Sequence, residues 1–135
     1  VVAAWSRFKK PITSAGVAMI FNWRDDLQVY LYSQAVDMRK QLNGLLMVVS
    51  ERICDKPQSG TLYLFYNRQR DKVKGVWWDN NGFMLLDKRL EKGRFKLKEI
   101  KQDLKLTPQQ LSWLLAGLDF IHLNRNTPIP YSEYL

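Results

Sequence analysis

The chain has 135 residues, a length that suits one domain with a buried core of its own. Hydrophobic residues make up 46% and charged residues 25%, as in an average globular protein, so disorder is not the default. No apolar run approaches the roughly 18 residues of a membrane span. The net charge of +8 favours a polyanionic partner, either nucleic acid or an acidic membrane face.

The N-terminal half predicts a strand followed by a helix. Residues 1–18 show no sustained periodicity, so we expect a leader there and a domain that begins near Met19. The run 27–32 is rich in β-branched and aromatic residues and predicts a strand. After a turn, Asp37 stands where an N-cap belongs, and an apolar stripe at helical spacing continues to Cys54.

The middle of the chain predicts a hairpin. Residues 61–66 are apolar on both faces, as in a central strand. A basic loop at 67–71 separates them from a return strand at 72–78, in which Gly75 indicates a bulge or a close backbone approach.

A turn with the sequence D-N-N-G follows at 79–82. Because Phe83, Leu86 and Leu90 recur at helical spacing, we predict a short helix over 82–92, with a strand as the alternative.

The C-terminal part predicts one clear helix. Residues 95–97 are short and extended, as in an edge strand. Thr107-Pro108 with Gln110 forms a capping box at a helix start, and residues 121–135 are expected to be a tail. The order β-α-β-β-α-β-α predicts a single α+β domain with a small, mostly antiparallel sheet and two or three packed helices.

Residues 67–96 carry nine Lys or Arg interleaved with aromatic residues, the composition of a surface that meets phosphates and bases. The alternative is a solvated strand edge beside an ordinary amphipathic helix. Trp77 and Trp78 point to opposite faces of a strand, so only one of them is expected to be exposed. The predicted nucleic-acid-binding residues are Arg68, Arg70, Lys72, Lys74, Trp77, Trp78, Lys88, Arg89, Lys92 and Arg94.

Catalytic chemistry has little support in the sequence. The single cysteine, Cys54, excludes an internal disulfide and fits a reducing cytoplasm. One cysteine and one histidine, His122, are too few for a zinc site of the usual kind. No phosphate-binding glycine motif is present. We therefore expect no catalytic residues, no metal and no cofactor. The carboxylates are numerous enough to leave a metal-dependent nuclease open as a minor alternative.

Five ordered blocks carry a family resemblance: D-M-R-K-Q-L-N-G-L (37–45), F-Y-N-R-Q-R-D-K-V-K (65–74), W-W-D-N-N-G-F (77–83), K-R-L-E-K-G-R-F (88–95) and L-T-P-Q-Q-L…L-L-A-G-L-D (106–119). Together they resemble the TnpB, or Orf2, accessory protein of IS66-like bacterial insertion sequences. The motif residues are Asp37, Arg39, Lys40, Asn67, Asp71, Asp79, Gly82 and Gly93. Two departures stand out: Gly75 replaces a bulky aliphatic residue, and Leu97-Lys98 replaces a Trp-Pro pair.

The resemblance implies a non-enzymatic auxiliary role in transposition, beside a larger transposase of the same element. The first hypothesis is binding to DNA, either non-specifically or at the ends of the insertion sequence, by a cytoplasmic protein that associates with the nucleoid. The second is a module that docks on the transposase through apolar anchors of the last forty residues, without direct DNA contact.

Overall fold

The computed structural model describes residues 25–123, so the expected leader at 1–18 and residues 124–135 of the expected tail lie outside the described residues. The elements in chain order are β1 (Val29–Leu31), α2 (Leu42–Val48) with a π-helical turn (Val49–Ile53), a 3-10 turn (Pro57–Ser59), β2 (Leu62–Tyr66), β3 (Lys72–Asp79), β4 (Gly82–Arg89), β5 (Leu104–Leu106) and α3 (Pro108–Leu115). Within 25–123, no helix is long and apolar enough to cross a bilayer.

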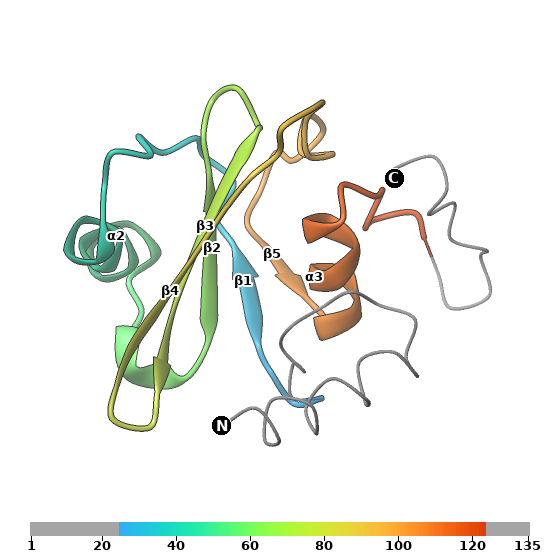
Figure 1. Ribbon diagram of the computed structural model, residues 1–135. Helices are drawn as coiled ribbons and strands as arrows, with labels where there is room; N and C mark the ends of the chain where they lie inside the picture. The colour runs from blue at the N-terminus through green and yellow to red at the C-terminus, as the bar shows by residue number, and fades with distance from the viewer. Residues whose placement is uncertain (1–24, 124–135) are drawn as a thin grey trace, which may run out of the picture.

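The strands form one sheet in the order β4-β3-β2-β1-β5 (Figure 1). Only β1 and β2 run parallel, joined by the crossover through α2, and the other neighbours are antiparallel. The prediction of a single α+β domain with a mostly antiparallel sheet is therefore confirmed.

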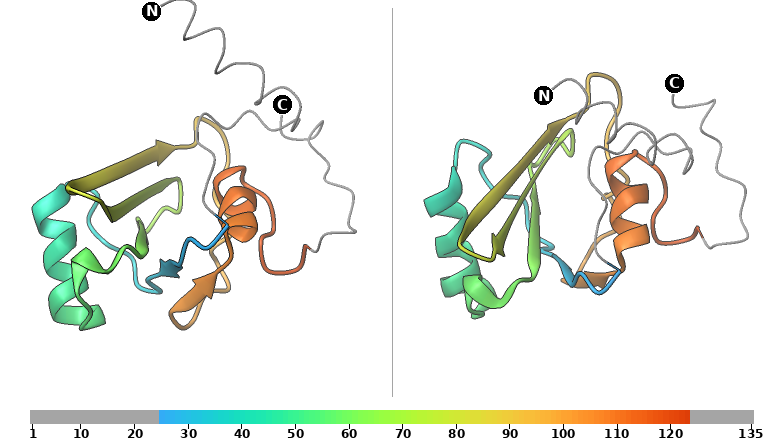
Figure 2. Two further views of the ribbon diagram at one scale, coloured as in Figure 1. Left: turned by 90° about the horizontal axis from the view of Figure 1, so that it is seen from below. Right: turned by 60° about the horizontal axis from the view of Figure 1, so that its bottom comes forward.

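Strand β2 lies at the centre and is buried along its whole length. Its residues alternate between two cores, because successive side chains of a strand point to opposite faces. Leu62 and Leu64 pack with α3, whereas Tyr63 and Phe65 pack with α2 and its π-helical turn. The two helices thus cover opposite faces of the sheet (Figures 1 and 2).

The helix predicted over 82–92 is wrong, and the strand alternative is what the structure contains. Asn80 adopts a left-handed conformation (φ 61°) in a two-residue turn, which folds the chain back on β3. All eight residues of β4 then pair with β3. The helical spacing of Phe83, Leu86 and Leu90 is one pattern within a run of apolar residues that occupies both faces of a strand.

The predicted strand at 95–97 is also absent, and the sheet edge is formed by β5 instead.

Asp37 is not the N-cap of α2. The helix begins at Leu42 after an extended Gln41, and Asp37 instead accepts hydrogen bonds from the backbone N–H (2.9 Å) and the guanidinium (2.6 Å) of Arg39. These bonds from Arg39 lower the pKa of Asp37 to about 2.

In contrast, α3 begins as predicted, with the Thr107 hydroxyl accepting from the N–H of Gln110 and the Gln110 side chain accepting from the N–H of Thr107.

Gly75 marks a close approach rather than a bulge. The pairing of β3 with both neighbours is continuous through this residue. A Cβ at Gly75 would lie 3.0 Å from methyl groups of Leu62 and Leu64, so these two side chains fill the space left by the missing side chain. This explains why the strand tolerates a glycine in its interior.

Lys74 is the only charged residue among 25–123 that is buried, with 2% of its surface exposed. Its ammonium group donates hydrogen bonds to the carbonyl groups of Met38 (2.8 Å) and Lys40 (3.0 Å) and lies 3.8 Å from the Asp87 carboxylate on β4. The side chain therefore ties the loop before α2 to the sheet.

Replacing Lys74 by Met should destabilise the fold by about 1–3 kcal/mol, because two backbone carbonyls lose their donor. The measurement is the free energy of unfolding in urea. Lys72→Met, two residues along the same face of β3, is the matched control and should change stability by less than about 0.5 kcal/mol. Equal losses in the two variants would contradict a structural role for Lys74.

Asp103 attaches the segment before β5 to β1. Its carboxylate accepts hydrogen bonds from the Tyr30 hydroxyl and from the N–H of Ser33 (2.8 Å). Partial burial opposes ionisation of Asp103, but these bonds outweigh it and lower the pKa of the carboxyl. Burial and the same bond raise the pKa of Tyr30 to about 12.

Because the folded pKa of Asp103 lies below the unfolded value, its ionised form stabilises the fold above about pH 4. That contribution should disappear as the pH falls below about 4 through the lowered folded pKa. The free energy of unfolding of the wild type should thus exceed that of Asp103→Asn by about 1–2 kcal/mol at about pH 7, and this difference should shrink towards about pH 2. Urea unfolding across this range measures it, and a gap that does not change with pH would refute the assignment.

Candidate nucleic-acid interface

The turn between β2 and β3 is built by Asn67. Its side-chain oxygen accepts hydrogen bonds from the N–H groups of Asp71 (3.1 Å) and Lys72 (3.0 Å), and its amide donates to the Asp71 carboxylate (2.6 Å). Arg70 occupies a left-handed conformation with φ 61°. Two of the motif residues, Asn67 and Asp71, are therefore engaged in holding the turn, while Arg68 and Arg70 lie between them.

The segment after β4 is fastened to this turn. The N–H of Leu90 donates to the carbonyl of Asp71 and the N–H of Phe95 to that of Arg70, each at 2.8 Å. Gly93, with φ 78°, supplies the left-handed residue of the intervening bend. Two buried side chains, Phe95 and Leu97, anchor the segment in the core that also contains α3.

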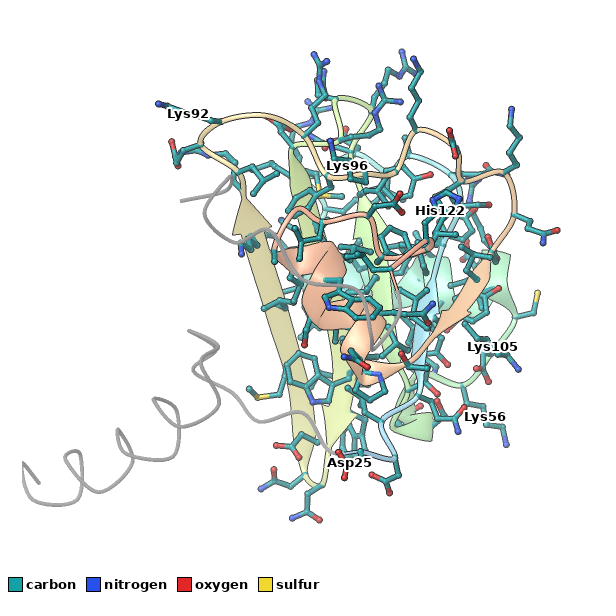
Figure 3. All side chains as sticks on the ribbon, turned by 90° about the vertical axis from the view of Figure 1, so that its right-hand side faces the viewer. Asp25, Lys56, Lys92, Lys96, Lys105 and His122 are labelled. Atoms are coloured by element: carbon teal, nitrogen blue, oxygen red, sulfur yellow. The ribbon has the colours of Figure 1, made fainter. Side chains whose placement is uncertain are left out.

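These contacts hold two basic segments together at one end of the molecule. The basic residues that alternate with Phe95 and Leu97 are exposed there. Figure 3 shows Lys92 and Lys96 at this end and Asp25 at the other. We call it the basic end, and it consists of Arg68, Arg70, Lys72, Arg89, Lys92, Arg94, Lys96 and Lys98.

The charge of the basic end is largely unbalanced. Arg89 lies 3.3 Å from the Glu91 carboxylate in an exposed pair, and the other seven cations form no ion pair with any residue of the described range. Residues 67–101 hold eleven Lys or Arg against five Asp or Glu, whereas the rest of the described chain holds five against seven. The excess of positive over negative charge in the described chain thus comes from residues 67–101.

Two of the predicted binding residues lie outside the basic end. The ammonium group of Lys74 is buried, as described above. Lys88 donates to the carbonyl of Leu115 at the end of α3 (2.7 Å), and partial burial lowers its pKa although part of its side chain is exposed. The ammonium group of Lys74 is therefore not available to a phosphate, and that of Lys88 is engaged in a contact within the protein.

The tryptophans also lie away from the basic end. Trp77 packs against the core on the α3 face of the sheet, and Trp78 is half-buried on the α2 face, edge-on to Phe83 with ring centres 5.0 Å apart. Lys72 and Trp78 stand at opposite ends of the same strand, a separation of about 20 Å. The basic and aromatic residues that alternate along the sequence therefore do not form one mixed surface.

The turn formed by Asp79 and Gly82 lies at that far end of β3 and β4 as well. Arg39, by contrast, lies near the basic end. It lines a cleft of about 580 Å³ between the loop at 35–39 and the turn at 67–72, together with Arg68 and Lys72. Its guanidinium is paired with Asp37, and the adjacent Lys40 contributes its carbonyl to Lys74.

The list of predicted binding residues ends at Arg94 and omits Lys96 and Lys98, although Lys96 is one of the nine cations counted in 67–96. The signal that identifies them is the alternation R-F-K-L-K over 94–98, in which Phe95 and Leu97 are buried and the three basic residues are exposed. Such alternation is typical of an extended segment with one face on a core, even where no strand forms.

No group of three metal-ligating side chains occurs among residues 25–123. His122 is engaged by Asp119, whose carboxylate lies 2.7 Å from the imidazole, and this bond raises the pKa of His122. Cys54 is exposed and its thiol contacts the carbonyl of Glu51 at 3.6 Å. No hydrogen bond joins Cys54 to His122, so the two residues do not form a nucleophile–base pair.

Comparison with known proteins identifies the family. The family model for "IS66 Orf2 like protein" matches residues 27–125. Two proteins of Sinorhizobium fredii (strain NBRC 101917 / NGR234) are similar: y4jC is 32% identical over 100 residues, covering 73% of this chain and 86% of its own, and y4hO is 33% identical over 98 residues, covering 72% and 85%. No solved structure matches the chain significantly. The chain belongs to the IS66 Orf2-like family, the accessory proteins of transposition in IS66-type insertion sequences.

Proposed function

We propose that this accessory protein acts by binding DNA through its basic end. The observation that carries the proposal is the pair of backbone hydrogen bonds from Leu90 and Phe95 to the turn at 67–71. They bring two basic segments, separate in the chain, onto one surface. In the bacterium, such binding would associate the protein with the nucleoid.

The chemistry of the basic end favours phosphates over bases. Seven of its eight cations have no carboxylate partner among the described residues, so phosphate oxygens can replace water around them without breaking an ion pair. Long Lys and Arg side chains on turns and extended segments contact the backbone of a duplex, and such contacts carry no sequence information. No helix of the described chain starts or ends within the basic end, so a major-groove reading helix has no counterpart there.

Affinity for duplex DNA should therefore depend steeply on salt and little on sequence. Each phosphate contact contributes about 0.9 to the slope of log K against log salt. The double charge reversal Arg68→Glu with Arg70→Glu should weaken binding to all duplexes alike and flatten that slope by roughly two. Fluorescence anisotropy with two labelled duplexes of unrelated sequence, titrated from low to moderate salt, measures both quantities.

A matched control is the double reversal Lys56→Glu with Lys105→Glu. It changes the net charge equally, but both lysines lie away from the basic end (Figure 3). The control should retain the wild-type slope. A control that flattens the slope as much as the Arg68 and Arg70 pair would contradict a localised site. Absence of binding at low salt would overturn the DNA proposal and leave docking on the transposase as the role to pursue.

We also propose that the role is non-enzymatic. Two carboxylates near the basic end are already engaged, Asp71 by Asn67 and Asp87 by Lys74 (3.8 Å), so cations dominate the free charged groups around a bound phosphate. Purified protein with Mg²⁺ or Mn²⁺ should leave plasmid and terminal-repeat DNA intact on agarose gels. Cleavage that is abolished by replacing a single carboxylate, for instance Asp79→Asn, would establish a nuclease instead.

A further inference from the structure

The two edges of the sheet differ in how they are protected. Strand β5 has three residues with the exposed Lys105 in the middle, and short, charged strands are a common defence against pairing with other chains. Strand β4 forms the opposite edge with eight residues, all paired to β3 on its inner side. Its outer backbone groups pair with no strand of the described chain.

The first half of β4 is also apolar. Phe83, Met84, Leu85 and Leu86 follow one another without a charge, and Met84 (37%) and Leu85 (38%) are among the four exposed large hydrophobic residues of 25–123. Along a strand, four consecutive apolar residues occupy both faces. A long edge strand with uncovered apolar side chains on both faces is the form that recruits another strand.

The sequence of β4 is suited to pairing with itself. If two copies join about a two-fold axis normal to the sheet, paired residues must share a face, which restricts the possible registers. One of these sets Leu85 opposite Leu85 and Met84 opposite Leu86 of the second copy, so the apolar halves meet at the centre. It also sets Lys88 opposite Gly82, where even an added Cβ would meet nothing within 4 Å, so like charges do not oppose each other.

The charges of the two ends are complementary in this arrangement. Arg89 closes β4 at the basic end, whereas Asp79 stands at the turn that opens it. Antiparallel pairing brings the Arg89 end of each copy beside the Asp79 turn of the other. A parallel arrangement would instead bring Lys88 and Arg89 next to their own copies, at a cost in repulsion.

We propose that β4 pairs antiparallel with β4 of a second copy, centred on Leu85, so that one sheet continues through a homodimer. Each copy covers the apolar edge of the other and satisfies its outer backbone groups. The proposal concerns the protein without DNA and does not depend on the function of the basic end.

Sedimentation velocity over a concentration series tests the proposal with the full chain. Wild type should approach twice the 15.9 kDa of the chain as concentration rises. Leu85→Lys should remain monomeric, because it sets two lysines opposite each other at the two-fold axis. The matched control, Ile121→Lys, adds the same charge at another exposed apolar residue (42%) outside the sheet and should dimerise like wild type.

Amide hydrogen exchange supplies a readout that does not rely on a variant. Exchange within 82–89 should slow at dimeric concentrations, since unpaired edge amides become hydrogen-bonded, while exchange in 104–106 should not change. A wild type that stays monomeric, a Leu85→Lys variant that still dimerises, or a dimer whose 82–89 amides exchange at the monomer rate would each overturn the proposal.

Discussion

The burial of β2 on both faces is the constraint from which the rest of the fold follows. A strand whose five residues are all buried requires a neighbouring strand on each side and a helix above and below. Its alternating side chains define the two cores, one under α2 and one under α3. Its C-terminal end fixes where the turn at 67–71 emerges, and through the hydrogen bonds of Asn67 that turn becomes a rigid support for the basic residues. The candidate surface therefore depends on the sheet although none of its cations lies in the core.

Local signals in the sequence are sufficient for the elements that local interactions determine. The capping box at Thr107, the strand at 61–66 and the hairpin turn are predictable because neighbouring residues supply their hydrogen bonds or their pattern. Strand β4 is mistaken for a helix because its apolar residues fit two periodicities at once. The deciding interaction is its pairing with β3, and an amphipathic pattern over so short a segment does not contain that information. Asp37 is not the N-cap because α2 begins only at Leu42, and its carboxylate binds Arg39, two residues along the chain, instead.

The candidate surface is predictable in composition but not in arrangement. The sequence identifies the basic segments, and the structure brings most of those residues to one end. The sequence does not indicate that Lys74 and Lys88 bind carbonyl groups from distant parts of the chain. Nor does it separate the tryptophans from the cations, because an extended strand turns residues that are close in sequence into residues about 20 Å apart. Membership of the IS66 Orf2-like family associates the protein with transposition.

The alternation of Arg94, Phe95, Lys96, Leu97 and Lys98 has an evolutionary consequence. The two apolar residues fasten the segment to the core, while the three basic ones are exposed. Selection can therefore add, remove or exchange charges at these positions with little penalty in folding. Under the DNA-binding role proposed above, such exchanges would change the salt dependence of binding while the interior of the protein remains the same.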